Sequence, residues 1–468
     1  MTKVLIDRGW VIAMAASEDG AAGEDGLAEV VEDGAVAVDG DRIVAVGPRD
    51  EVLATGFVAE RVIDASGRAV LPGLVNTHFH FVGSLIKALT EDVAGFGGGA
   101  FSIGIPLQER HVGPGDVYYP GLVHGLEALK TGTTCVNEMW WLQPESAKVA
   151  RDLGIRAVIG GVIRELDTGT ITADNLDRAW QPALAEQGLE ECQRLIEDWH
   201  GAEDGRITCR VAPDGPDRLR EETLVRTKEL AQRFGVGMHT HVASFAGEIA
   251  FMSERYGKGS IEFLHDLGML GPDLVAAHCV CVSESEIEIM AESGTNMAHT
   301  PYLVGKRGYF PPMERIYDAG VQVSLGTDWV SNDMWKTMRA AIILSRVTSG
   351  RVTLCSGPEA LRMATIGGAR CLGMADEIGS LEVGKKADLI VLDVTTPWCS
   401  PIRAQNLITN IVYNANGSDV THVMVDGRLL VEDRVVTVLD EAEVLCDGQK
   451  GAEKVWREAR VLLGDAPG

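Results

Sequence analysis

The chain has 468 residues, 46% of them hydrophobic, which is enough for a large buried core and for more than one small domain. Its formal net charge is −26, and such an acidic balance disfavours nucleic acid and anionic membranes as partners, because both are themselves negative. No apolar run reaches the ~20 residues of a membrane span, no secretory signal is visible, and the cysteines form no CxxC pair, so we expect a soluble, cytoplasmic protein with reduced thiols.

The first 66 residues predict one half of a small β domain. Alternating apolar residues flank Asp39-Gly40, a dipeptide typical of a hairpin turn. The segment 16–33 is Gly-rich and acidic, and we expect it to form a flexible surface loop. Strands are expected at 3–13, 34–47 and 61–64.

From residue 67 to 384 the pattern changes to short apolar strands that alternate with longer helical stretches. This alternation is typical of repeated βα units and a parallel sheet. Eight strands with helices between them predict a TIM-type (β/α)8 barrel. The strands are expected at 68–76, 132–137, 155–162, 206–212, 234–241, 273–280, 295–299 and 321–327. The helices include 144–153, 185–199, 219–233, 246–257, 282–293 and 312–319.

Residues 385–440 show the same pattern of short apolar strands and hairpin turns as the N-terminal segment. Strands are expected at 388–393 and 421–431, the second with a turn at Asp426-Gly427. The fold class is therefore α/β, with the barrel inserted into a small composite β-sandwich domain formed by the N- and C-terminal segments; two separate sheets are the alternative. Residues 441–468 form a tail with a helical segment to which the sequence assigns no role.

Two pairs of histidines stand at the ends of apolar strands. His78 and His80 follow AVLPGLV, and His239 and His241 end FGVGMHTH. Side chains two residues apart on a strand point to the same side, so both imidazoles of a pair can reach one cation. Functional groups collect at strand ends in an α/β barrel. One such pair alone is weak evidence, because this spacing is common by chance.

His278 and Asp328 extend the pattern to two further strand ends. Imidazole and carboxylate ligands together suit zinc, iron or cobalt better than magnesium or calcium. Each residue taken alone has a plain structural explanation, as a hydrogen-bonded core histidine or a helix-capping aspartate. The coincidence of four such strand ends in one barrel favours a metal site.

The segments LPGLVNTHFH, HTHVAS, LVAAHCV and GTDWVSND resemble motifs of the amidohydrolase superfamily, in the order and at the spacing of that family. GTTCVNE at 132–138 is similar to its second-strand motif, and IGSLEVGKKADLIVLD to its closing stretch. The resemblance spans residues 3 to about 431. It points to the branch of triazine hydrolases and aminopurine deaminases.

The resemblance implies that His78, His80, His241 and Asp328 bind one divalent metal ion, with zinc expected and iron or cobalt as alternatives. It implies hydrolysis by metal-bound hydroxide, with Asp328 as general base and acid and His278 near the water or substrate. The fourth strand, RITCRVAPD, has no lysine of the kind that bridges two metals in bimetallic relatives. A mononuclear site follows.

Ser244 departs from the pattern of the deaminase branch, which has a glutamate three residues after the ligand matched by His241. That carboxyl protonates a ring nitrogen, and a serine hydroxyl cannot do so. Glu248 lies four residues further on, either as a functional substitute or as a helix residue with a structural role. His239 is expected to support the ligands from behind or to take a direct part.

The missing glutamate makes hydrolysis of an amide, urea or carbamate the main functional hypothesis, since a carbonyl needs only the cation and one acid/base group. On this point the chain resembles the phenylurea hydrolase and thiocarbamate (molinate) hydrolase subgroup. The alternative is a deaminase or chlorohydrolase of a triazine, purine or similar ring. A second alternative is a non-catalytic scaffold, against which the retained ligands argue.

The substrate is expected to be a small molecule, apolar or aromatic, because aromatic residues gather near the strand ends. Lys306, Arg307 and Tyr309 either contact substrate or belong to a solvated loop. The Gly-rich stretch 95–106 is expected to be a mobile lid rather than a stable helix. A homo-oligomer is also expected. The expected substrate contacts are His299, Tyr302, Trp329 and Ser244.

Overall fold

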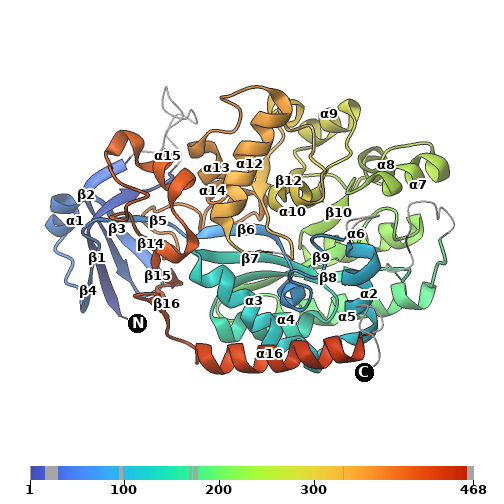
Figure 1. The fold of residues 1–468 in the computed structure, drawn as a ribbon, viewed down its shortest axis with the longest axis horizontal. Coiled ribbons are helices and arrows are strands. Elements are labelled where there is room, and N and C mark those ends of the chain that lie inside the picture. The colour runs from blue at the N-terminus through green and yellow to red at the C-terminus, as the bar shows by residue number, and fades with distance from the viewer. Residues whose placement is uncertain are drawn as a thin grey trace.

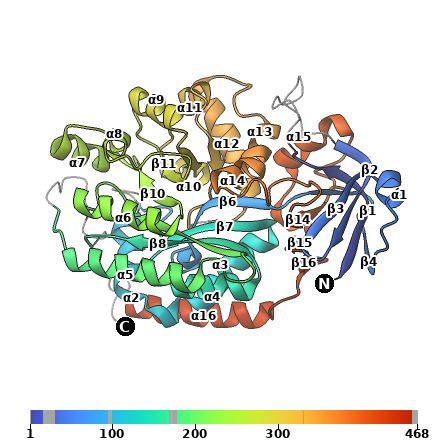
Figure 2. The ribbon, with the colours of Figure 1, turned by 180° about the vertical axis from the view of Figure 1, so that it is seen from behind.

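The computed structural model describes residues 2–15, 30–93, 99–167, 171, 178–329 and 331–460. Of the predicted loop 16–33, residues 16–29 lie outside this described part, and 30–33 belong to a strand. Figure 1 shows a small sheet beside a larger barrel, and strands from both ends of the chain belong to this sheet. The view from behind in Figure 2 shows the same two parts.

The small domain is built on one sheet whose nine strands, counted in the described residues, come from both ends of the chain. Strand β14 pairs antiparallel with β5, opposing Leu389 to Pro72, so the two halves form one continuous sheet and not two hydrogen-bonded sheets. The strands are β1 (Lys3–Ile12), β2 (Val30–Asp39), β3 (Arg42–Pro48), β4 (Arg61–Asp64), β5 (Arg68–Pro72), β14 (Leu389–Asp393), β15 (Val420–Val425), β16 (Arg428–Glu432) and β17 (Val435–Val436).

The predicted barrel is confirmed as eight parallel strands, β6 to β13 in order, within the described residues. It closes between its first and last strands, where the backbone N–H groups of Thr327 and Asp328 donate to the carbonyl of His78 at 3.1 and 2.9 Å. The strands are β6 (Leu74–Phe79), β7 (Thr133–Trp140), β8 (Arg156–Ile163), β9 (Ile207–Pro213), β10 (Met238–Val242), β11 (Leu274–His278), β12 (Asn296–His299) and β13 (Val323–Leu325).

The prediction of one barrel strand at 68–76 is wrong, because the chain divides at Gly73 into β5 of the sheet and β6 of the barrel. The N–H of Gly73 donates to Asp388 of the sheet at 3.0 Å, and the next N–H, of Leu74, donates to Gly132 of the barrel side at 2.9 Å. A Cβ on Gly73 would lie 2.0 Å from the Thr134 hydroxyl. Glycine therefore permits the close approach at which the chain changes sheets.

Amphipathic helices cover the barrel, as α5 illustrates by burying Leu189, Cys192 and Ile196 and exposing charged residues. The predicted helices are α4 (Gln143–Leu153), α5 (Pro182–Trp199), α6 (Glu221–Phe234), α7 (Ala246–Tyr256), α9 (Glu284–Ser293) and α11 (Met313–Asp318). Helices not predicted are α1 (Arg49–Ala54), α2 (Ile105–His111), α3 (Tyr118–Lys130), α8 (Ser260–Asp266), α10 (Pro301–Lys306), α12 (Met334–Ser349), α13 (Gly357–Met363), α14 (Ile366–Cys371) and α15 (Ala404–Asn414).

The stretch predicted as a non-helical lid at 95–106 is helical where it is described. A π-helix at Ala100–Gly104 leads directly into α2, and residues 95–98 lie outside the described part. Ile105 and Leu107 are buried in a cluster with Trp329, so packing outweighs the low helix propensity of the glycines.

The C-terminal tail contains α16 (Glu441–Glu458), which runs along α3 at the edge of the barrel (Figure 1). Val455 and Ala452 are buried in the same cluster as Ile105, so the tail belongs to the packed structure. Among the helices of the described part, none is long and apolar enough to span a bilayer.

Candidate metal centre

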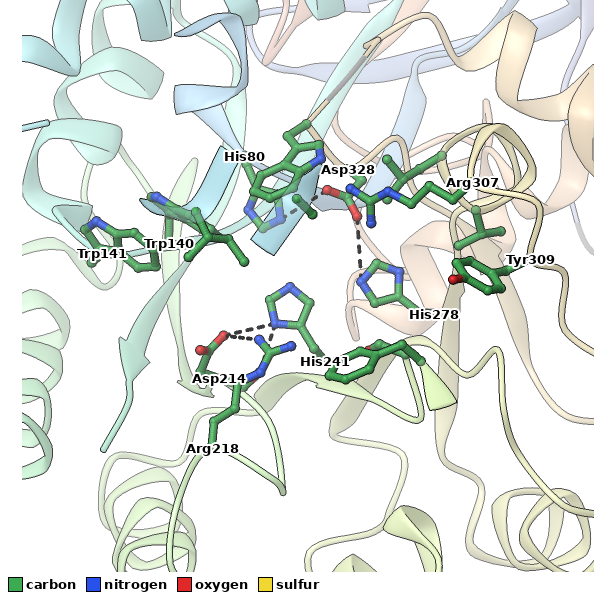
Figure 3. A pocket seen from close by; sticks show the side chains of 17 residues that line it. His80, Trp140, Trp141, Asp214, Arg218, His241, His278, Arg307, Tyr309 and Asp328 are labelled. Atoms are coloured by element: carbon green, nitrogen blue, oxygen red, sulfur yellow. Dashed lines mark hydrogen bonds and ion pairs between the residues drawn. The ribbon is translucent and has the colours of Figure 1, made fainter. Parts of the chain in front are cut away.

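Side chains from four strand ends converge at one mouth of the barrel. His78 and His80 come from the end of β6 and the residue after it, His241 from β10 and His278 from β11, and Asp328 follows β13. Oxygen atoms of the Asp328 carboxylate lie 3.5 Å from Nε2 of His78, 3.5 Å from Nε2 of His80 and 3.6 Å from Nε2 of His278. Figure 3 shows Asp328, His80, His241 and His278 around one space.

The Nδ1 atoms of four histidines make contacts on the side away from the common space, so their Nε2 atoms face that space. These histidines are His78, His80, His241 and His278. For His78 to offer Nε2 to a cation, its Nδ1–H must donate to Nε2 of His239. His239 is fully buried and contacts His78 from the side opposite the common space, which places it as a support for that ligand. The Nδ1 contacts are His78 with Nε2 of His239 at 3.0 Å, His80 with the Met139 carbonyl at 2.5 Å, His241 with the Asp214 carbonyl at 2.8 Å, and His278 with the Thr300 hydroxyl at 2.9 Å.

The donor atoms fit one cation. Ligand atoms of His78, His80 and Asp328 lie within 4.8 Å of one another, as do those of His78, His241 and His278. Nε2 of His78 is buried and has no hydrogen-bond partner among the described residues. A buried polar atom without a partner is unfavourable, and a cation at this place would supply one. Three or four imidazoles with one carboxylate suit zinc and related transition metals.

Burial sets the protonation of these groups. It lowers the pKa of His80 and of His278 well below the ordinary value, so both imidazoles are neutral and available as ligands near pH 7. For Asp328, burial raises the pKa, but the neighbouring imidazoles of His78 and His80 favour the ionised carboxylate more strongly, so its pKa lies well below the usual range. The carboxylate is ionised and can accept a proton from a neighbouring water.

The backbone is strained at this mouth of the barrel. His278 has φ of 77° and Asp328 has φ of 62°, in the left-handed region that non-glycine residues seldom adopt. Such outliers cluster at functional sites, where the surrounding structure imposes them. Here the strain turns both side chains toward the common space.

Aromatic and apolar side chains form the walls of the pocket above these ligands. The Trp140 ring centroid lies 4.9 Å from that of His80, and the Trp329 centroid 6.0 Å from it. Flat walls of this kind favour a flat substrate. The other described lining residues are Ala100, Ile105, Trp141, Asp214, Arg218, His241, Ser244, Phe245, His278, Leu303, Val304, Arg307, Tyr309 and Asp328.

Two of the four predicted substrate contacts, Ser244 and Trp329, line this pocket, and two do not. His299 is fully buried with its ring 5.3 Å from that of Phe310, and Tyr302 lies against Lys306. His299 ends β12 and Tyr302 follows it, but neither is among the residues that line the pocket. The structure therefore gives no support to a direct substrate contact for His299 or Tyr302.

Glu248 is directed away from the pocket and into the turn before α7. Its carboxylate accepts hydrogen bonds from the N–H groups of Ala243 at 2.5 Å and Ser244 at 2.8 Å and from the Ser260 hydroxyl at 2.6 Å. Burial raises its pKa to about 7. The contacts give Glu248 a supporting position behind Ser244.

Asp214 and Arg218 are pocket residues that the sequence analysis missed. Asp214 directly follows β9, and its carboxylate pairs with Arg218 at 2.9 Å while also contacting Nδ1 of His241 at 3.2 Å. Burial raises the pKa of Asp214, but Arg218 and His241 lower it below the usual range. Its place at a strand end in RVAPD is the signal that could have identified it.

Known proteins resemble this chain over most of its length. The sequence pattern described as the amidohydrolase family matches residues 69–430, and one described as an imidazolonepropionase-like composite domain of bacteria matches residues 34–55. The chain is 33% identical to 5'-deoxyadenosine deaminase of Methanosarcina mazei, across 97% of this chain and 99% of that protein. It is 34% identical to 5-methylthioadenosine/S-adenosylhomocysteine deaminase of Moorella thermoacetica, across 91% and 96%.

Solved structures include similar folds. An adenosine deaminase from Xanthomonas campestris with bound zinc has a TM-score of 0.84 and 28% identity, covering 97% of this chain and 98% of that one. A triazine hydrolase variant has a TM-score of 0.82 and 24% identity, covering 97% and 100%, a likeness of fold alone.

Proposed function

Since the chain belongs to the amidohydrolase family, we propose that it is a metal-dependent aminohydrolase that removes an amino group from a small heteroaromatic ring. The deaminases at 33% and 34% identity support this activity over the amide, urea or carbamate hydrolysis that was the main hypothesis from the sequence. The observation that carries the proposal is the convergence of His78, His80 and His278 on the Asp328 carboxylate, with His241 grouped beside His78 and His278.

His78, His80, His241 and Asp328 would hold the metal ion, as proposed from the sequence. When bound, a divalent cation lowers the pKa of water toward neutrality and polarises the atom under attack. The chain's contribution is to hold the four ligands in place through their contacts from behind. His239 has this role toward His78, at 3.0 Å.

Asp328 moves the proton. Its carboxylate is ionised in the free site, so it accepts a proton from the attacking water and returns it to the departing amino nitrogen. His278 lies 3.6 Å from this carboxylate, and its backbone strain fixes the ring beside the reaction centre. There it can hydrogen-bond to the oxygen that attacks the substrate.

Trp140 and Trp329 would hold the flat ring, and Ser244 would face it from the turn after β10. The Ser244 hydroxyl is buried and has no hydrogen-bond partner within the described parts of the chain. It can donate a hydrogen bond to a ring nitrogen, although it cannot release a proton as a carboxylic acid does.

Hydrolysis of a carbonyl substrate, such as a phenylurea or a thiocarbamate, is the second candidate. Ser244 favours it, because attack on a carbonyl needs no protonated ring nitrogen. Glu248 does not compensate, since its carboxylate is bound to two backbone N–H groups behind the pocket.

The test measures metal content and the released nitrogen together. Zinc-loaded enzyme is given adenosine, 5'-deoxyadenosine and melamine, with ammonia as the readout, and phenylurea and a thiocarbamate, with the amine as the readout. Ammonia release that a chelator abolishes and zinc restores supports the proposal. Amine release alone favours the carbonyl candidate, and no turnover with a full equivalent of zinc contradicts both.

A further inference from the structure

Arg307 follows α10 and places its guanidinium inside the pocket. In Figure 3 it lies beside Asp328 and points into the same space as His278. Its Nη2 atom is shielded from solvent and has no hydrogen-bond partner in the part of the chain that the structure describes. A shielded N–H donor without a partner is costly, so the position of this atom calls for a ligand that supplies an acceptor.

The surroundings keep Arg307 in this position. Its guanidinium lies 5.7 Å from the ring centroid of Trp329, within the range of a cation–π contact. Burial lowers the pKa of Arg307, but an arginine side chain stays protonated under ordinary conditions. The pocket therefore presents a fixed positive charge against an aromatic wall.

The neighbouring cations are already paired. Lys306, one residue earlier, binds Glu91 at 3.0 Å at the surface, and Arg218 binds Asp214 at 2.9 Å. Within the described residues, Arg307 is the pocket cation that has no carboxylate oxygen within 4.0 Å.

The charge balance of the site points in the same direction. The formal charges of the described pocket residues Asp214, Arg218, Arg307 and Asp328 cancel. A divalent cation then leaves two uncompensated positive charges in a largely apolar pocket. An anionic substrate would relieve this excess, because opposite charges attract strongly where water is excluded.

We propose that Arg307 determines specificity by binding an anionic oxygen of the substrate, so the natural substrate is a small flat acid such as a heteroaromatic carboxylate. The guanidinium donates two parallel hydrogen bonds to the carboxylate while the ring packs between Trp140 and Trp329. This inference rests on the proposed function, since it places the substrate over the same centre.

The test compares benzoate with benzamide, a neutral molecule of the same shape, by calorimetric titration into the zinc-loaded protein. We expect benzoate to bind at least about tenfold more tightly, the factor that a charge-assisted hydrogen bond contributes. Arg307→Met should abolish this preference. Lys306→Met, which removes the adjacent but surface-paired charge, should keep it.

Acetohydroxamate, a neutral metal chelator, should bind the wild type and Arg307→Met equally, which separates loss of the anion site from loss of the metal. If Arg307→Met does not fold, Arg307→Lys should still lower the preference at least about threefold, because lysine cannot form the paired contact. Equal binding of benzoate and benzamide by the wild type, or a preference that survives replacement of Arg307, overturns the proposal. These titrations need no turnover, so their failure is distinct from a failure of the ammonia assay.

Discussion

At the scale of single residues, Asp328 occupies the point where three imidazoles meet, and its replacement tests the chemistry most directly. Asp328→Asn keeps the size of the side chain but removes the proton acceptor. We expect kcat to fall by about 10²–10⁴-fold, the usual contribution of a general acid–base group. Steady-state kinetics with zinc content measured on the same sample checks this. A variant that contains zinc and retains more than a tenth of the activity would contradict the role.

Ser244 offers a test of the difference between the two candidate reactions. Ser244→Glu places a carboxyl in the pocket wall, and we expect ammonia release from heteroaromatic substrates to rise about tenfold relative to amine release from phenylurea, because the carboxyl can protonate a ring nitrogen. Ser244→Gln is the matched control, since it has the same size without the acid. An equal ratio of the two activities in both variants would show that ring protonation does not limit the reaction.

The sequence predicted this cluster because a spacing of two on a strand places side chains on one face. His78 and His80 follow that rule, and Asp328 stands at a strand end. Asp214 was missed although it stands at a strand end, and the role of Arg218 is visible only when its pairing with Asp214 beside β10 is known. His299 also stands at a strand end, yet it is buried outside the pocket. Spacing identifies ligands better than it identifies substrate contacts.

At the scale of elements, Glu138 of β7 connects the segment that follows His80 with helix α4. Its carboxylate accepts from the N–H of Phe81 at 2.8 Å and from the Ser146 hydroxyl of α4 at 3.1 Å. Burial raises its pKa from the ordinary value of 4.5 to about 8. In the folded protein the group is therefore protonated near neutral pH, whereas in the unfolded chain it is ionised.

A pH dependence of stability follows from Glu138. Because the folded protein holds this proton more tightly, its contribution is present below pH ~4.5 and is lost as pH rises toward ~8. Glu138→Gln removes the titration, so its Tm relative to the wild type should rise by at least ~2 °C between pH 5.5 and 8. Differential scanning fluorimetry measures this, with the solvent-exposed Glu229→Gln as a control that should show no such trend.

Elements with clear apolar periodicity were predicted, and those defined by tertiary contacts were not. The strand at 68–76 reads as one apolar run, and only the partners on either side of Gly73 divide it. The helix α2 follows a glycine-rich segment whose composition argues against helix, but Ile105 and Leu107 pack into a buried cluster. Local sequence cannot show such a cluster, because its members are distant in the chain.

At the scale of the whole molecule, Arg156 links the barrel to the small sheet. It begins β8 and pairs with Asp388 at 2.8 Å and with Asp426, and all three residues are largely buried. Arg156→Met leaves the buried Asp388 carboxylate without its cation, whereas Asp426 keeps Lys386 at 3.6 Å, and we expect a loss of about 3–5 kcal/mol in the free energy of unfolding.

Urea titration of Arg156→Met measures this loss. Arg151→Met is the control, because Arg151 pairs with Asp152 at the surface, where an ion pair contributes about 0–1 kcal/mol. If both variants lose the same amount, the buried link between barrel and sheet is not a main source of stability.

The architecture was predictable because βα alternation and two flanking hairpin segments are periodic features. The pairing of β5 with β14, which makes one sheet from both ends, depends on residues more than 300 positions apart. Domain boundaries at 66, 384 and 440, a homo-oligomer and a cytoplasmic location stay predictions.

The hydrogen bonds from Thr327 and Asp328 to the His78 carbonyl have a consequence for biosynthesis. His78 leaves the ribosome about 250 residues before Asp328, which at roughly 5–20 residues per second is a delay of about 12–50 s. During that interval the nascent chain carries histidines able to take up a cation but lacks the carboxylate that completes the set. Arrival of the last barrel strand and of Asp328 therefore closes the barrel sheet and brings in the last of these side chains at the same time, while about 140 residues are still to be synthesised.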